Sequence, residues 1–343
     1  MSADKQVDLV ISGGGVKGLA APGAVTRLFE EGYTFPRVAG TSAGALTAAV
    51  VAAAQKNGGG AETLRDVMSR LDPSKIPDRA PAIPLLGEGL ALLTRSGLYQ
   101  GNYIRDWLHR ELKDLYVETF EDLRRLDPHD DPAITDDQCY SLVVMATDVT
   151  HGRSLQLPWD YRKHFDRDPD ELLVADAVRM SLSIPFYFDP CSLTNATTDE
   201  KSVIVDGGVL SNLPLEIFDR TDGKKPRWET FGVRLLPDLP EGLGTLLPAK
   251  FPGYLRPGPI RLLEQVLATA IVGHDQTHLD QPGVADQLIE IDTSGVDLIE
   301  FDLTRRQRDE LFEKGWQAAD DFLSRRKARS VGGTVKVGPP PAS

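Results

Sequence analysis

Short apolar runs alternate with stretches of helical periodicity over the first sixty residues. Residues 7–11 are mostly apolar and β-branched, as in a buried strand, and residues 19–31 place apolar side chains at helical spacing. Residues 38–40 have the character of a second strand end, and residues 45–56 are apolar on every side, which is typical of a buried helix. This order predicts an α/β protein in which neighbouring strands run parallel.

The same alternation continues along the rest of the chain, and the last helix has a clear start signal. Thr304 and Gln307 have the spacing of a capping box, in which each side chain binds the other residue's backbone N–H. Further strands are predicted over residues 141–146, 153–157, 203–205 and 286–291, and further helices over residues 62–71, 171–183 and 262–271.

We expect a single domain over residues 1–328, followed by a disordered tail over residues 329–343. Residues 58–139 look like an insertion of helices and loops within that domain. Two apolar stretches punctuated by proline and glycine, residues 72–100 and 237–260, are candidate lids over a lipid site. For the stretch within residues 72–100, a surface loop packed on the core is an equally supported alternative.

The first strand leads into a glycine-rich loop, and Gly13, Gly15 and Gly18 satisfy the pattern G-x-G-x-x-G. A dinucleotide site would need an acidic residue about 20 positions further on, but residues 38–40 supply none. A phosphate loop would need its lysine after the last glycine, and Lys17 precedes it. We therefore favour an oxyanion hole, because successive glycines expose backbone N–H groups that can bind a developing negative charge.

The second strand leads into Gly40-Thr41-Ser42-Ala43-Gly44, which fits the pattern G-x-S-x-G. Such a sequence predicts a sharp strand-to-helix turn that exposes the serine hydroxyl at the positive end of a helix. A third motif, Asp206-Gly207-Gly208, follows the strand over residues 203–205. All three motifs stand at the carboxyl ends of predicted strands, so we expect them to converge, although an aspartate at such a place is often only a turn residue.

Composition limits the classes of partner and the cellular compartment that fit this protein. The 38 basic and 51 acidic residues give a net charge of −13, which argues against nucleic acid as a partner. Cys139 and Cys191 are too few for a disulfide framework and suit a reducing compartment. No apolar run is long enough to span a bilayer, and no leader is evident, so we expect a cytoplasmic protein with at most peripheral membrane contact.

Metal chemistry is a weak alternative. The acidic run over residues 127–137, which includes His129, is typical of a solvated loop, and His274 and His278 are four apart without the glutamate of a zinc protease. We expect no metal and no cofactor.

Taken together, the glycine loop, the serine turn and Asp206-Gly207-Gly208 resemble the patatin-like phospholipase family, as do residues 183–186 and 212–214. The resemblance covers about residues 7–325 and implies a three-layer α/β/α sandwich with a mostly parallel central sheet. It implies that Ser42 is the nucleophile and Asp206 its base in the hydrolysis of lipid acyl esters. The backbone N–H groups of three residues would form the oxyanion hole: Gly13, Gly14 and Gly15. The residues that would support the motifs are Lys17, Gly18, Gly40, Gly44, Gly207 and Gly208.

Apart from the resemblance, the residues themselves allow two ways to activate the Ser42 hydroxyl. A Ser–Asp–His triad is available on paper with His274 or His278, but an α/β-hydrolase places more than one strand before its nucleophile. A Ser–Asp dyad needs only Asp206, whose pKa would gain from being raised by partial burial. We favour the dyad, acting on phospholipids or related acyl esters, over two further alternatives, a non-catalytic lipid-binding protein and a nucleotide-binding protein.

Overall fold

The computed structural model describes residues 5–78, 97–125, 134–220, 222–236, 284–296 and 301–332. Most of the two candidate lids, the acidic run around His129, and both His274 and His278 lie outside these residues.

A central sheet organises the described part of the chain, with strand order β11-β10-β1-β3-β5-β9-β8, while β2 pairs with β1 and β6 with β5. Five strands from β11 to β5 run parallel, β6 and β9 pair antiparallel with β5, and β8 pairs antiparallel with β9. A separate pair, β4 (Gly97–Tyr99) and β7 (Phe186–Phe188), is parallel. The strands of the central sheet are β1 (Lys5–Ile11), β2 (Tyr33–Thr34), β3 (Val38–Thr41), β5 (Leu142–Asp148), β6 (Arg153–Leu157), β8 (Cys191–Thr194), β9 (Lys201–Asp206), β10 (Glu229–Leu236) and β11 (Leu288–Asp292).

In the described part of the chain, helices lie between these strands and after the last of them. The α-helices are α1 (Ala21–Glu30), α2 (Ala43–Lys56), α3 (Ala61–Ser69), α5 (Asn102–Asp114), α6 (Tyr161–Phe165), α7 (Val174–Ser181) and α10 (Arg305–Gly332). The 3₁₀ helices are η1 (Gly15–Ala20), η2 (Pro73–Lys75), η3 (Phe120–Leu123), η4 (Asp136–Gln138), η5 (Pro169–Glu171), η6 (Gly207–Val209), η7 (Leu215–Phe218) and η9 (Val284–Asp286).

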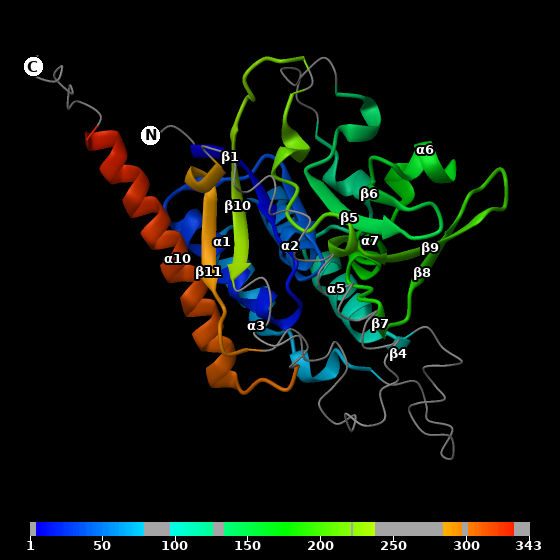
Figure 1. Ribbon diagram of the computed structural model, residues 1–343, viewed down its shortest axis with the longest axis horizontal. Coiled ribbons are helices and arrows are strands. Elements are labelled where there is room, and N and C mark those ends of the chain that lie inside the picture. Colours follow the sequence, from blue (N-terminus) through cyan, green and yellow to red (C-terminus); the bar gives the residue numbers. More distant parts are fainter. Residues whose placement is uncertain are drawn as a thin grey trace, which may run out of the picture.

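Alternation along β1 shows how the two faces of the sheet are covered. Leu9 and Ile11 belong to the large core shared with α1, α2, α7 and α10, whereas Val10 packs on the opposite face with Leu213 and Phe218. Figure 1 shows α10 lying along α1 and β11 at one edge of the molecule, with β8 and β9 at the other. The predicted mixed α/β fold with a mostly parallel central sheet is confirmed.

Two predicted helix features are also confirmed. In α2 every residue from Gly44 to Ala54 is buried, as expected for a helix that is apolar on all sides. The Thr304 N–H donates to Gln307 Oε1 at 2.9 Å and the Gln307 N–H donates to Thr304 Oγ1 at 3.3 Å, which is the predicted capping box. The helix that follows, α10, continues past residue 328 to Gly332.

The register of β9 carries its last residue to the serine turn. Thr41, at the end of β3, pairs with Met145 of β5, and the next residue of β5, Ala146, pairs with Asp206. Because β5 extends beyond the level at which β3 ends, the antiparallel β9 has room to pair with it and still end beside Ser42. The three predicted motifs therefore meet at the same end of the sheet, where β1 and β3 finish. The third strand, β9, runs opposite to β1 and β3.

Candidate active site

Ser42 occupies a backbone conformation that few residues other than glycine adopt. Its φ of 53° and ψ of −125° place it at the N-cap of α2, immediately after β3. The glycines on either side make this turn possible, because a Cβ on Gly40 would lie 2.5 Å from the Gly44 oxygen and one on Gly44 would lie 2.3 Å from the Ile11 oxygen. The predicted sharp strand-to-helix turn at Ser42 is therefore present.

A second serine, Ser181, fixes the backbone of the turn by a hydrogen bond. The Ser42 N–H donates to Ser181 Oγ at 2.8 Å, and Ser181, the last residue of α7, is fully buried. Ser181 could not be predicted from the sequence as part of the site, since a serine at the end of an apolar helix gives no signal of its own. Its contact fixes the backbone of the residue that carries the predicted nucleophile.

Asp206 lies at the end of β9 and is 2% exposed. Its Oδ1 accepts a hydrogen bond from the Gly208 N–H at 2.8 Å, whereas Oδ2 has no hydrogen-bond partner in the described structure. Burial raises the pKa of Asp206 to about 7, against the lowering effects of the Ser42 hydroxyl and the Gly208 N–H. The Ser42 hydroxyl thus lies near enough to Asp206 to influence its charge, and the pKa of Asp206 is shifted in the direction that a base for Ser42 would need.

The glycine loop approaches Ser42 from the end of β1. The Gly13 N–H donates to the side-chain oxygen of Asn212 at 2.9 Å, and a Cβ on Gly13 would lie 2.6 Å from that oxygen and 3.0 Å from Ser42 Cβ. Within the described residues, no acceptor is found for the N–H groups of Gly14 and Gly15. Two of the three predicted oxyanion donors are therefore available, and the third is already hydrogen-bonded.

The remaining motif residues serve the packing around this site. A Cβ on Gly18 would lie 2.3 Å from Ala43 Cβ, so η1 and α2 approach closely there. Lys17 is buried, and its charge adds slightly to the lowering of the pKa of Asp292 on β11, which comes mainly from hydrogen bonds with Ser294. Gly207 packs against the backbone of β5, which keeps the segment after β9 close to the sheet.

Three histidines fall within the described residues, and each has partners away from the site. His109 lies 3.7 Å from a Glu118 oxygen, His151 Nδ1 lies 2.8 Å from Asp148 Oδ2, and His164 Nδ1 lies 2.9 Å from an Arg153 nitrogen. No contact between these histidines and Ser42 or Asp206 is found in the described part of the chain.

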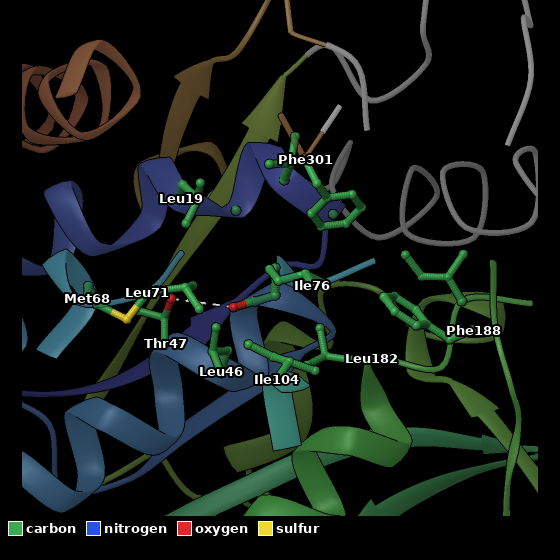
Figure 2. A pocket seen from close by; sticks show the side chains of 15 residues that line it. Leu19, Leu46, Thr47, Met68, Leu71, Ile76, Ile104, Leu182, Phe188 and Phe301 are labelled. Carbon is green, nitrogen blue, oxygen red and sulfur yellow. Dashed lines mark hydrogen bonds between the residues drawn. The ribbon is translucent and has the colours of Figure 1, made fainter. Parts of the chain in front are cut away.

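An apolar pocket opens beside the serine turn, between η1 and the first turns of α2. The space there that protein atoms do not fill is about 530 Å³, a volume that includes open solvent. Figure 2 shows Leu19 on one side of the pocket and Leu46, Thr47 and Ile104 on the other. Its lining includes Gly15 and Ala43, immediate neighbours of the oxyanion loop and of Ser42, and extends to Met68, Leu71, Ile76, Leu182, Ile184, Phe188 and Phe301.

The described part of the chain holds neither a cluster of metal-binding side chains nor a helix suited to a membrane. No group of three or more histidine, cysteine, aspartate or glutamate side chains is arranged to hold a metal ion there. None of the helices described is both long enough and apolar enough to cross a bilayer.

Fold and site together define a mixed α/β protein with a serine on a strand-to-helix turn, next to a buried carboxyl group and a glycine loop. The chain belongs to the patatin-like phospholipase family: the sequence model described as "Patatin-like phospholipase" matches residues 9–219. The resemblance stated from the three motifs is confirmed.

One relative of similar length, one longer relative and a solved structure agree with this assignment. The chain is 33% identical over 319 residues to the uncharacterized protein YqhO of Bacillus subtilis, covering 92% of this chain and 98% of YqhO. It is 27% identical to the uncharacterized NTE family protein MT2641 of Mycobacterium tuberculosis, covering 92% of this chain but 46% of MT2641. The crystal structure of VipD from Legionella pneumophila shares the fold, with a TM-score of 0.50 and 20% identity over 94% of this chain and 68% of that one. Family membership supports lipid hydrolysis at the level of the family.

Proposed function

We propose that this protein is a serine hydrolase that cleaves acyl esters of phospholipids or related lipids through Ser42 and Asp206. Asp206, when ionised, accepts the proton of the Ser42 hydroxyl as the serine oxygen attacks the ester carbonyl. The tetrahedral intermediate expels the alcohol, which takes the proton back from Asp206. Water then attacks the acyl-serine with Asp206 again as base, releasing a fatty acid and restoring Ser42.

The single observation that carries this proposal is the buried Asp206 carboxyl group beside the Ser42 hydroxyl: its Oδ2 has no partner with good hydrogen-bond geometry in the described structure, yet the Ser42 hydroxyl is close enough to lower the pKa of Asp206. A buried carboxyl oxygen without a hydrogen bond is costly in a folded protein, and a structural turn aspartate would be expected to have both oxygens satisfied. The pKa of about 7 leaves about half of the Asp206 side chains ionised near neutral pH. Such a group can accept a proton from Ser42 and return it within one catalytic cycle.

The oxyanion is assigned to the glycine loop. We propose that the Gly14 and Gly15 N–H groups bind the carbonyl oxygen as it becomes negative, since both lack acceptors in the described structure. Gly13, which the sequence also suggested as a donor, is already bonded to Asn212 and takes the role of fixing the loop. The N-terminal end of α2 at Ser42 adds a favourable partial positive charge.

The apolar pocket supports a lipid rather than a small polar ester as substrate. It begins at Gly15 and Ala43, so an acyl chain bound there would have its carbonyl carbon near Ser42. Each methylene buried contributes about 0.8 kcal/mol, or about fourfold in kcat/KM, until the pocket is full. Because such substrates reside in bilayers, we also propose that the protein works peripherally at a membrane surface from the cytoplasm, without a nucleic-acid partner.

Labelling with a fluorophosphonate and turnover of p-nitrophenyl esters of increasing chain length test the proposal. Wild-type protein should be labelled and Ser42→Ala should not, with a turnover loss of about a thousandfold or more. The matched control is Ser141→Ala, which should behave as wild type, because within the described residues the Ser141 hydroxyl donates to a backbone oxygen of η3 and to nothing else. Wild-type protein that folds but neither labels nor turns over esters would instead favour a non-catalytic lipid-binding protein.

A pair of substitutions tests the pocket. Met68 and Leu115 are both partly buried at the edge of the core, but only Met68 lines the pocket. Met68→Trp should reduce kcat/KM for long acyl chains and leave short ones unaffected, because the indole fills the outer part of the pocket. Leu115→Trp should leave the dependence on chain length unchanged. Equal effects of the two substitutions would place the acyl chain elsewhere.

A further inference from the structure

One segment after β9 contacts both of the other motifs. The Ser211 oxygen accepts a hydrogen bond from Thr41 Oγ1 at 3.3 Å, next to the nucleophile, and the following residue, Asn212, accepts from the Gly13 N–H at 2.9 Å. The segment is itself folded tightly, since the Ser211 N–H donates to the Gly207 oxygen at 2.9 Å. The stretch that begins with Asp206 therefore also reaches the serine turn and the glycine loop.

The chemistry of the amide fixes the orientation of Asn212. A backbone N–H can only donate, so the atom of Asn212 that faces Gly13 must be its carbonyl oxygen. The approach is close: a Cβ on Gly13 would lie 2.6 Å from this oxygen and would force the Asn212 amide to shift. Asn212 is half-buried, and its side-chain oxygen stands where a substrate oxygen would otherwise compete for the Gly13 N–H.

We propose that Asn212 is a positioning residue for the oxyanion hole. By occupying the Gly13 N–H, it holds the glycine loop at a fixed distance from Ser42 and leaves the Gly14 and Gly15 N–H groups to bind the substrate oxygen. This inference rests on the proposed function, and it adds that the oxyanion hole has two backbone donors and a side-chain anchor. The loop and the base are thereby set by residues of the same short segment.

Loss of the Asn212 hydrogen bond should weaken stabilisation of the transition state more than it weakens binding of the substrate. The hydrogen bond itself is worth only about 1 kcal/mol of stability, but a displacement of about 1 Å in a catalytic group can cost a hundredfold in rate. Acyl-chain binding depends on the apolar pocket, which Asn212 does not line. We therefore expect an effect on kcat with little change in KM.

The experiment compares Asn212→Ala and Asn212→Asp with the wild type, using kcat and KM per active site titrated with a fluorophosphonate. Asn212→Ala should lose about ten- to a hundredfold in kcat with KM within about twofold. Its affinity for an acyl trifluoromethyl ketone, which forms a tetrahedral adduct with the serine, should fall in parallel with kcat/KM. Asn212→Asp keeps the acceptor for Gly13 but adds a negative charge near Ser42, so its activity should recover towards high pH, where Asp206 is ionised despite that charge.

The matched control is Asn195→Ala. Asn195 is also half-buried, and its side-chain oxygen also accepts backbone N–H bonds, from Thr197 and Thr198 at 2.9 Å each, at the turn before β9 and away from the site. That variant should lose stability without losing kcat per active site.

Three results would overturn the proposal: wild-type kcat per active site in Asn212→Ala, a parallel loss of kcat in Asn195→Ala, or an Asn212→Asp variant equally impaired at every pH. The last comparison still decides the matter if Asn212→Ala does not fold. Failure of wild-type protein to label at Ser42 would instead remove the proposed function, and the two failures are therefore distinct.

Discussion

Replacing Asp206 by asparagine should stabilise the protein while it abolishes turnover. Asparagine has nearly the same shape, keeps an oxygen for the Gly208 N–H, and carries no charge to be buried. In the wild type, burial raises the pKa of Asp206 from its ordinary value of 3.8 to about 7, so the native state resists ionising this group. The protein thus carries a destabilising carboxylate at neutral pH, and Asp206→Asn removes it.

The size and the pH window follow from the two pKa values. Because the native pKa is the higher one, the native protein binds the proton more tightly, and wild-type stability falls as pH rises from about 4 to about 7. Each pH unit in that window is worth about 1.4 kcal/mol, which gives a total of about 4 kcal/mol. Asp206→Asn should therefore equal the wild type near pH 4 and exceed it by up to about 4 kcal/mol at pH 8.

Thermal or urea unfolding of both proteins between pH 4 and pH 8 measures this difference. The control is Asp309→Asn, an exposed position on α10, where the substitution should leave stability unchanged across the range. An Asp206→Asn variant that is no more stable than wild type at pH 8, or one whose advantage is the same at pH 4, would refute the reasoning. Retained ester turnover in that variant would refute the role of Asp206 as base.

Two further predictions concern the same site. The kcat/KM of wild-type protein should fall below a midpoint near pH 7, by about tenfold per pH unit, because only the ionised form of Asp206 can accept the serine proton; a flat profile between pH 5 and pH 8 would contradict this. Ser181→Ala should lower kcat by about tenfold or more, since the Ser42 N–H loses its acceptor. The control Ser141→Ala should leave kcat unchanged. Equal kcat in both variants would show that Ser181 does not position the nucleophile.

The elements that position the site could be predicted because they depend on local sequence. Two glycines and a uniformly apolar helix predict the strand–turn–helix around Ser42. The spacing of Thr304 and Gln307 predicts the capping box. Convergence of the glycine loop with the serine turn followed from the rule that parallel strands share an edge for their carboxyl ends. The resemblance to a family added the role of Asp206, which spacing alone left open.

The rest depends on contacts between distant residues, which leave little trace in the pattern. Ser181 binds the Ser42 backbone over a separation of 139 residues, and Asn212 binds that of Gly13 over 199. A serine in an apolar helix or an asparagine before a leucine and a proline carries no periodic signal that names its partner. Nor does the pattern say that β9 runs antiparallel, because a strand's direction is decided by its neighbours rather than by its own residues.

The direction of β9 decides where this protein can accept insertions. The turn before β9, residues 195–200, lies at the end of the strand opposite to Asp206, so extra residues there would lengthen a hairpin that points away from the chemistry. A single residue added within β9 would instead shift its last position by about 3.3 Å and reverse the face of every side chain beyond it. Natural or engineered variation in length should accordingly gather in the hairpin and spare the strand.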